Sequence, residues 1–140
     1  LMMIARNRIL LTLFVFMWGM TLTHGQNFIG LHKDNIAKVL RQDHPDFRID
    51  NSSVNNTYKY LKFIDSVSEQ TILFFLSDDD MCTYVRWISD YANLNDMIGM
   101  LNRTYKKNGE KSWTYSHDGK HYAVTLEEEE WYFTVNIRKE

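Results

Sequence analysis

Two histidines beside a predicted hairpin turn have the spacing that most suggests metal or acid–base chemistry. His117 and His121 flank Asp118-Gly119, a dipeptide typical of a two-residue type I′ turn. The two imidazoles could approach each other across that turn. A metal site needs three or four ligands oriented by neighbouring groups, and only Asp118 is near. We therefore interpret both histidines as surface residues and predict that the protein holds no metal and no cofactor.

Two runs of adjacent acidic residues could supply carboxylate chemistry. Residues 78–80 are three aspartates, but they lack the Asp-x-Asp-x-Asp-Gly spacing of a calcium loop. The second run is Glu127, Glu128, Glu129 and Glu130. Two of these carboxylates could act as general acid and general base if their environments separated their pKa values. No second polar group marks a partner for either run, so we predict two solvated turns.

The single cysteine and the absence of familiar catalytic motifs narrow the enzyme classes. Cys82 opens a predicted apolar strand directly after three acids, which would raise the pKa of its thiol. We therefore predict a buried structural thiol rather than a nucleophile paired with His44, His117 or His121. The sequence contains no Gly-x-Ser-x-Gly elbow, Gly-rich phosphate loop or His-Glu-x-x-His motif.

Aromatic residues on neighbouring predicted strands offer a binding surface instead. They are Trp87, Trp113, Tyr115, Tyr122, Trp131 and Tyr132. Every second residue of a half-buried strand faces the core, so about half of these rings are structural. Tyr115 and Tyr132 are our candidates for the exposed half. Together with His117 and His121 they form the predicted binding face.

The elements that position these residues begin with a helix over residues 31–40. Ile36, Val39 and Leu40 lie on its apolar stripe, and the helix must end before Pro45. A polar loop at residues 51–57 follows a short candidate strand at 47–50. Three strands are then predicted at residues 58–65, 71–76 and 82–89. The second of them is apolar on both faces, which is typical of a central strand.

A second helix has the clearest periodicity in the chain. Its apolar face consists of Leu94, Met97, Ile98, Leu101 and Tyr105. Asn93 is a candidate N-cap. Lys106 and Lys107 suit the negative C-terminal end of the helix dipole, and Gly109 would stop the helix.

Three further strands complete the prediction. Residues 113–117 and 121–126 form the hairpin, and residues 131–138 alternate as a half-buried strand. The fold class is therefore α+β, a single antiparallel sheet with two helices on one face in the order α-β4-α-β3. The pattern also suggests two helix-plus-meander halves, near residues 28–89 and 90–140.

The first 25 residues have the layout of a secretory signal peptide. Arg6 and Arg8 precede a ten-residue run, Ile9 to Trp18, that is apolar except for Thr12, and Thr23-His24-Gly25 provides a small-residue cleavage site. A transmembrane helix needs roughly 20 apolar residues, so no stable membrane span is expected after cleavage. We predict a mature N-terminus at Gln26. A retained leader that anchors an envelope structural subunit is the alternative.

Composition limits what the remaining chain can be. Residues 26–140 have the length of one domain, and one cysteine permits no intramolecular disulfide. Because the leader contains the basic residues Arg6 and Arg8 and no acid, 14 basic and 18 acidic side chains remain, a net charge of −4. There is no basic excess to bind phosphates, which argues against a nucleic-acid partner.

Parts of the sequence resemble small exported bacterial proteins. Residues 30–40, Gly-Leu-His-Lys-Asp-Asn-Ile-Ala-Lys-Val-Leu, look like the opening helix of many such domains. Residues 74–82, with the helix that ends Leu-Asn-Arg-Thr-Tyr at 101–105, resemble an uncharacterised family of small secreted bacterial α+β proteins. That family carries no assigned activity. The helix-plus-meander duplication is similar in outline to β-lactamase-inhibitory-protein-like domains, a likeness of architecture alone.

These observations favour a binding protein over an enzyme. We expect an exported protein, periplasmic or extracellular, that binds a protein or carbohydrate through the uncovered, aromatic-bearing face of its sheet. The alternative is a small secreted hydrolase that uses His117 and His121 or the carboxylates of residues 127–130.

Overall fold

The computed structural model describes residues 27–51 and 57–140. Within these ranges, one antiparallel sheet of eight strands carries two α-helices, which confirms a mixed α+β fold with a single sheet. The predicted signal peptide and most of the predicted loop at residues 51–57 lie outside the described residues. No helix in the described part of the chain is long and apolar enough to cross a membrane.

The two halves of the chain contain the same order of elements. The first half comprises α1 (Lys33–Asp43), β1 (Arg48–Ile49), β2 (Tyr60–Asp65), β3 (Gln70–Leu76) and β4 (Cys82–Ser89). The second half comprises the 3-10 turn η1 (Tyr91–Asn93), α2 (Leu94–Thr104), β5 (Lys106–Gly109), β6 (Ser112–His117), β7 (Lys120–Glu128) and β8 (Phe133–Lys139). Each half is thus one α-helix followed by a four-stranded meander.

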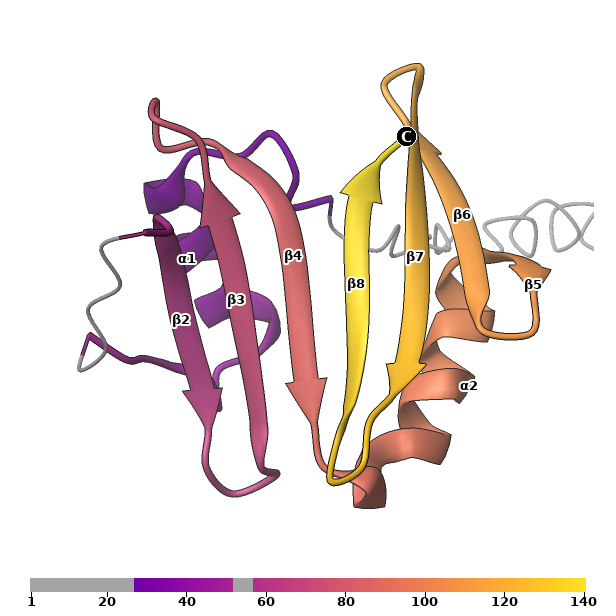
Figure 1. Cartoon of the computed structure of the whole chain (residues 1–140). Helices are drawn as coiled ribbons and strands as arrows, with labels where there is room; N and C mark the ends of the chain where they lie inside the picture. Colours follow the sequence, from indigo (N-terminus) through magenta and orange to yellow (C-terminus); the bar gives the residue numbers. More distant parts are fainter. Residues whose placement is uncertain (1–26, 52–56) are drawn as a thin grey trace, which may run out of the picture.

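The halves meet at the centre of the sheet. The strand order is β1-β2-β3-β4-β8-β7-β6-β5, so β4 and β8 are the central pair (Figure 1). β3 pairs with a strand on each side but lies third from one edge, not at the centre as its two-sided apolar run predicts. A central position in the sheet therefore does not explain why β3 is apolar on both sides.

The predicted order of elements is wrong by one strand. The residues that form β5 were predicted to form the C-terminal end of the second helix. In the structure α2 ends at Thr104, and Tyr105 is extended, with φ −123° and ψ 165°. Lys106 and Lys107 then pair with β6, and all four residues of β5 are exposed. A short, charged and fully exposed edge strand has no apolar alternation by which to recognise it.

Local signals account for the helix boundaries. His32 precedes α1 and its Nδ1 accepts a hydrogen bond from the Asp34 amide at 3.3 Å, while Pro45 lies just beyond the end of the helix. Asn93 occupies the N-cap position of α2, as predicted, but its side chain makes no capping bond. Its Nδ2 instead donates to Ser68 O at 2.8 Å and to Ser89 Oγ at 3.0 Å. That amide therefore ties the start of α2 to the β2–β3 turn.

Both helices pack against the same face of the sheet. Ile36 and Leu40 of α1 belong to a core cluster with Phe63 and Phe74, and the helices lie behind the sheet in Figure 1. Met97 and Leu101 of α2 belong to a second cluster, whose sheet residues are Trp113, Val124, Leu126, Phe133 and Val135. Trp87 and Ile137, on the two central strands, pack against both clusters. The opposite face of the sheet carries no helix among the described residues.

β8 departs from the predicted alternation. It begins at Phe133 rather than at residue 131, and Trp131 lies in the β7–β8 turn with 77% of its surface exposed. Thr134 and Asn136 point to the face without helices, yet both are buried. Tyr84 and Arg86 of the neighbouring strand contact Asn136, and Asn136 contacts Thr134, which sequence alternation cannot anticipate.

Candidate functional site

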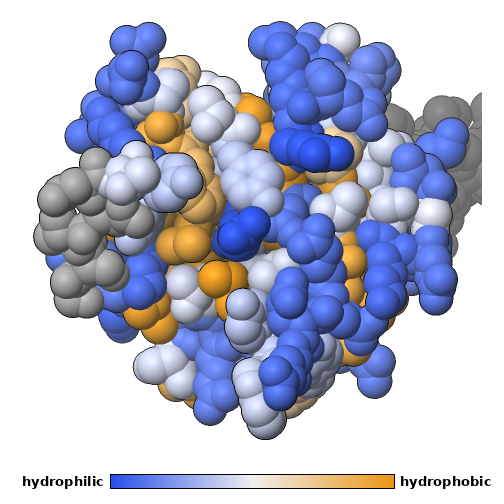
Figure 2. All heavy atoms as spheres, in the orientation of Figure 1, coloured by the Kyte–Doolittle hydropathy of each residue, from blue (hydrophilic) through white to orange (hydrophobic). Residues whose placement is uncertain are grey.

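A cluster of aromatic and apolar side chains occupies the uncovered face of strands β2, β3 and β4. It lines a hollow of 560 Å³ formed by Tyr58, Tyr60, Leu73, Phe75, Tyr84 and Arg86. We call these six residues the aromatic face. Figure 2, which looks onto the uncovered side, shows apolar atoms gathered over these strands and hydrophilic atoms over β6 to β8. A cluster of partly exposed aromatic side chains around a hollow makes this surface a candidate contact site.

Strand register brings the rings together. Tyr60 pairs with Phe75, and Phe75 pairs with Tyr84, so the three rings form one row across three strands. Directly opposed side chains in an antiparallel sheet lie close enough to touch. The ring centroids of Tyr60 and Phe75 are 5.9 Å apart, and those of Phe75 and Tyr84 are 5.5 Å apart. Tyr58, just before β2, meets Phe75 edge-on at 6.3 Å.

Asn136 of the central strand β8 forms hydrogen bonds with two residues at the edge of the aromatic face. The Tyr84 hydroxyl donates to Asn136 Oδ1 at 2.6 Å, and Arg86 Nε donates to the same oxygen at 3.0 Å. The Arg86 guanidinium also lies 5.8 Å from the Tyr84 ring centroid. Asn136 Nδ2 in turn donates to Thr134 Oγ1 at 3.1 Å. These contacts hold the Tyr84 and Arg86 side chains in place.

The remaining half of the same face is polar. Its outward residues on β6, β7 and β8 are Ser112, Thr114, Ser116, His121, Ala123, Thr125, Glu127, Thr134, Asn136 and Arg138. None of these is a phenylalanine, tyrosine or tryptophan. The aromatic face is therefore a local feature of the first half of the chain.

The predicted histidine pair does not assemble. Ser116 pairs with His121 and His117 pairs with Lys120, so the two imidazoles project from opposite faces of the hairpin. His117 Nε2 lies 3.3 Å from Asp118 Oδ2, and His121 Nδ1 lies 2.9 Å from Ser116 Oγ. The predicted turn itself is confirmed, since Asp118 and Gly119 have φ values of 50° and 75°.

Tyr115 lies on the helix-covered side of the sheet, not on the uncovered face where it was predicted. Its ring stacks between Tyr105 and Tyr122, with both centroid distances 4.8 Å. Its hydroxyl donates to Asn27 Oδ1 at 2.9 Å, and burial is the main cause that raises the pKa of this phenol. The prediction failed because Tyr115 shares the parity of Trp113, which is a core residue.

Tyr132 and the neighbouring glutamates lie at the β7–β8 turn. Tyr132 is 42% exposed, but that turn is at the opposite end of β7 from the histidine hairpin. Glu128 forms an ion pair with Lys111, and the Glu129 amide donates to Tyr132 O at 2.8 Å. The four predicted face residues are thus spread over two ends and two sides of the sheet. The geometry gives the hydrolase alternative no assembled set of groups.

The aspartate run and the cysteine have structural surroundings. Asp80 forms ion pairs with Lys59 and Lys33, and these bonds hold the pKa of its carboxyl below the ordinary value. Cys82 is buried as predicted, and burial raises the pKa of its thiol to about 11. Among residues 27–51 and 57–140, no group of three or more His, Cys, Asp or Glu is arranged to hold a metal ion.

No family model, curated protein or solved structure matches this chain. The family resemblance of the sequence therefore stays a prediction. Tyr60, Phe75 and Tyr84 were missed as site residues, although the run at residues 72–76 was the available signal. The run is apolar on its second side because Leu73 and Phe75 belong to the aromatic face, and not because β3 is a central strand.

Proposed function

We propose that this is an exported, non-enzymatic protein that binds a polypeptide partner through the aromatic face. The observation that carries the proposal is the Tyr60–Phe75–Tyr84 row on the face that carries no helix within residues 27–51 and 57–140. Interfaces between proteins are enriched in tyrosine, phenylalanine and arginine, and most of their binding energy comes from a few such side chains. The aromatic face has this composition.

Ring orientation favours a polypeptide over a carbohydrate. A sugar ring stacks best on aromatic surfaces that lie flat and open. Here neighbouring rings are inclined to each other, by 55° between Tyr60 and Phe75 and by 61° between Phe75 and Tyr84. Inclined rings enclose a hollow that suits a projecting apolar side chain, while Arg86 at the rim suits a carboxylate of the partner.

Export is the second part of the proposal. Residues 1–25 have the composition of a signal peptide, with Arg6 and Arg8 before the apolar run. The single cysteine is buried, so an exported protein would offer no exposed thiol for disulfide exchange in an oxidising compartment. The site of action would then be periplasmic or extracellular. Tryptic mass spectrometry of secreted protein should find Gln26 at the N-terminus.

Site-specific crosslinking tests the binding face. A photoreactive phenylalanine analogue replaces Tyr84 in the full chain, and the matched control carries it at Thr114 on the polar half of the same face. We expect a discrete crosslinked adduct in the cells that naturally produce the protein, formed from position 84 and not from position 114. Adding Tyr60→Ala should reduce the yield of that adduct about tenfold, the effect of losing one major contact residue.

The same experiment can overturn the proposal. Equal crosslinking from positions 84 and 114, or an adduct unaffected by Tyr60→Ala, would mean that the aromatic face makes no specific contact. An adduct that disappears after glycosidase treatment and contains no second polypeptide would identify a carbohydrate partner instead. Circular dichroism of each variant checks that the sheet is intact.

A further inference from the structure

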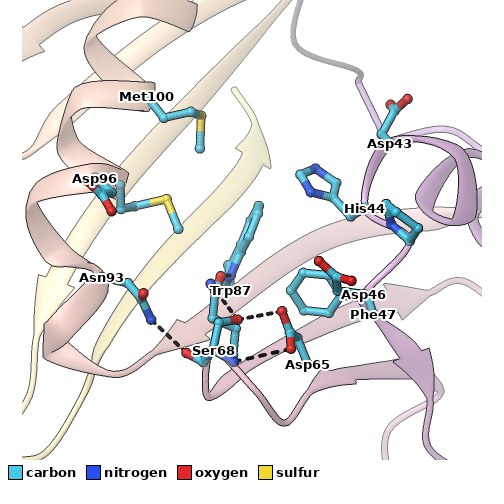
Figure 3. A pocket seen from close by; sticks show the side chains of 13 residues that line it. Asp43, His44, Asp46, Phe47, Asp65, Ser68, Trp87, Asn93, Asp96 and Met100 are labelled. Carbon is cyan, nitrogen blue, oxygen red and sulfur yellow. Dashed lines mark hydrogen bonds between the residues drawn. The ribbon is translucent and has the colours of Figure 1, made fainter.

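A second hollow lies on the other side of the sheet, between the two helices. Its volume is 410 Å³, within the range of small-molecule sites. The C-terminal end of α1 and the loop after it form one wall, α2 forms the other, and Trp87 of β4 lies between them (Figure 3). We call this hollow the interhelical pocket. It shares no lining residue with the aromatic face.

Three aromatic rings form one corner of the interhelical pocket. His44 and Phe47 come from the α1 side, and each meets Trp87 at 86°, with centroid distances of 5.6 Å and 5.8 Å. The rings of His44 and Phe47 are inclined to each other by 89°. Trp87 Nε1 donates to Gln70 Oε1 at 2.7 Å, which fixes the orientation of the indole. The three rings are thus mutually perpendicular.

Two methionines supply the apolar part of the wall opposite His44, which also carries Asp96. Met97 and Met100 of α2 line it, and Figure 3 shows Met100 across the pocket from His44. Thioether side chains are polarizable and adapt to the shape of a bound group. The pocket can therefore enclose the apolar body of a ligand on two sides.

The carboxylates that line the interhelical pocket face no basic side chain from lysine or arginine in the described lining. Four aspartates, Asp43, Asp46, Asp65 and Asp96, line it together with His44, and its described lining includes neither lysine nor arginine. Asp65 is buried, and the Ser68 hydroxyl donates to its Oδ2 at 2.5 Å. That bond and the backbone amides of residues 67 and 68 lower the pKa of Asp65, so its carboxylate stays charged. The carboxylates of the described lining therefore give the pocket an acidic character.

We propose that the interhelical pocket binds an organic ammonium ion. The faces of aromatic rings attract cations, most strongly when water is excluded, and carboxylates at the rim add attraction at longer range. The ligand could be a free amine or the side chain of a lysine in a polypeptide, since both present the same alkylammonium group. A bare metal ion would suit the pocket poorly, because hard cations require six to eight oxygen ligands rather than aromatic and thioether walls.

A pair of probes that differ only in charge tests this proposal. Choline carries a quaternary ammonium, and 3,3-dimethylbutan-1-ol is its neutral carbon isostere. Both are titrated into isotopically labelled protein while the Trp87 indole N–H resonance is followed by NMR. We expect choline to shift that resonance with a dissociation constant about tenfold lower than that of the alcohol. An acetylated lysine amide with a free ε-amine is the third probe, and stronger binding than choline would indicate a polypeptide side chain.

Variants on the pocket rim identify the binding groups without disturbing the core. His44 and Asp96 are exposed, so His44→Ala and Asp96→Asn should both fold normally. Each should weaken choline binding about fivefold, whereas the controls Glu130→Gln and Tyr84→Ala should leave it unchanged. Equal affinity for choline and the alcohol would overturn the proposal, and so would rim variants that bind like the unmodified protein. Because Tyr84 belongs to the aromatic face, either site can fail without the other.

Discussion

The two halves of this chain have the same order of elements but display different chemistry on the uncovered face of the sheet. On the covered face each half contributes a helix with two buried residues and a set of large apolar strand residues. On the uncovered face, β2 to β4 carry Tyr60, Phe75 and Tyr84, whereas β6 and β7 carry Thr114, Ala123 and Thr125.

This difference separates what the fold requires from what it does not. Threonine and alanine are enough to build the uncovered side of strands β6 and β7, so a stable sheet of this type does not need aromatic residues there. The aromatic face therefore goes beyond the needs of folding in the half where it occurs. That reasoning favours contact with a partner as the reason for the rings.

The sharpest test compares two adjacent residues of β3. Phe74 is fully buried under α1, and Phe75 is part of the aromatic face. We expect Phe74→Ala to lower the free energy of unfolding by about 3–5 kcal/mol, the cost of a large cavity in a core. Phe75→Ala should cost about 1 kcal/mol and should abolish crosslinking from position 84. Urea titration followed by circular dichroism measures the two stability changes. Equal losses of stability would mean that Phe75 contributes to folding as much as the core residue Phe74 does.

The next test concerns the contact between the two kinds of surface. Asn136, in the polar half, accepts hydrogen bonds from Tyr84 and Arg86 of the aromatic face. Asn136→Leu would leave both donors without this partner and should cost about 1–3 kcal/mol in urea unfolding. Thr125→Val, at the neighbouring outward position of β7, is the matched control and should change stability by less than about 0.5 kcal/mol. If Thr125→Val lowered stability as much as Asn136→Leu, the loss could not be assigned to the bonds from Tyr84 and Arg86.

The sequence predicted the periodic elements better than the surfaces between them. Both helices, the Asp-Gly turn and the antiparallel meanders follow from local patterns at residues 31–40, 94–105 and 113–126. β5 was missed because Lys106–Gly109 contains no apolar residue, and its lysines and glycine suit a helix end equally well. Local patterns cannot separate these two cases.

The candidate sites depended on information that local patterns lack. Alternation establishes that Trp113 and Tyr115 share a face, but it does not say which face the helices cover. The interhelical pocket draws on residues from 43 to 100, and only the packing of both helices on one face brings them together. The export signal lies in residues 1–25 and stays a prediction from sequence.

Ion pairs give the two halves opposite pH sensitivities. In the first half, a hydrogen bond from Lys59, with Lys33 nearby, holds the pKa of Asp80 below its ordinary value of 3.8. Its contribution to stability is therefore complete above pH 3.8 and is lost as the pH falls through the lower folded value. In the second half, Glu128 raises the pKa of Lys111 above 10.5, so that contribution is complete below pH 10.5 and is lost as the pH rises through the higher folded value.

Two substitutions should remove these sensitivities one at a time. Compared with the unmodified protein, Asp80→Asn should show a smaller loss of urea midpoint between pH 5 and pH 2, and Lys111→Gln a smaller loss between pH 9 and pH 12. Because both pairs are at least partly exposed, the changes should be small and should shrink with added salt. Asp79→Asn and Lys120→Gln are the controls. Equal effects from a pair variant and its control would attribute the pH dependence to net charge.

The smallest expected difference concerns whether the halves unfold separately. Cys82 reports on the first core cluster, because burial and a pKa of about 11 prevent labelling of its thiol until that cluster opens. Trp113 reports on the second, because its Nε1 donates to Asn102 Oδ1 at 2.9 Å and can exchange its hydrogen only on opening.

Trp87 and Ile137 pack against both clusters, so opening one exposes apolar surface of the other. The two opening free energies should therefore agree within about 0.5 kcal/mol. If Cys82 is labelled through a lower-energy opening than the one that exchanges Trp113, the first half of the chain is a separately unfolding unit, and the shared central strands do not couple the two meanders.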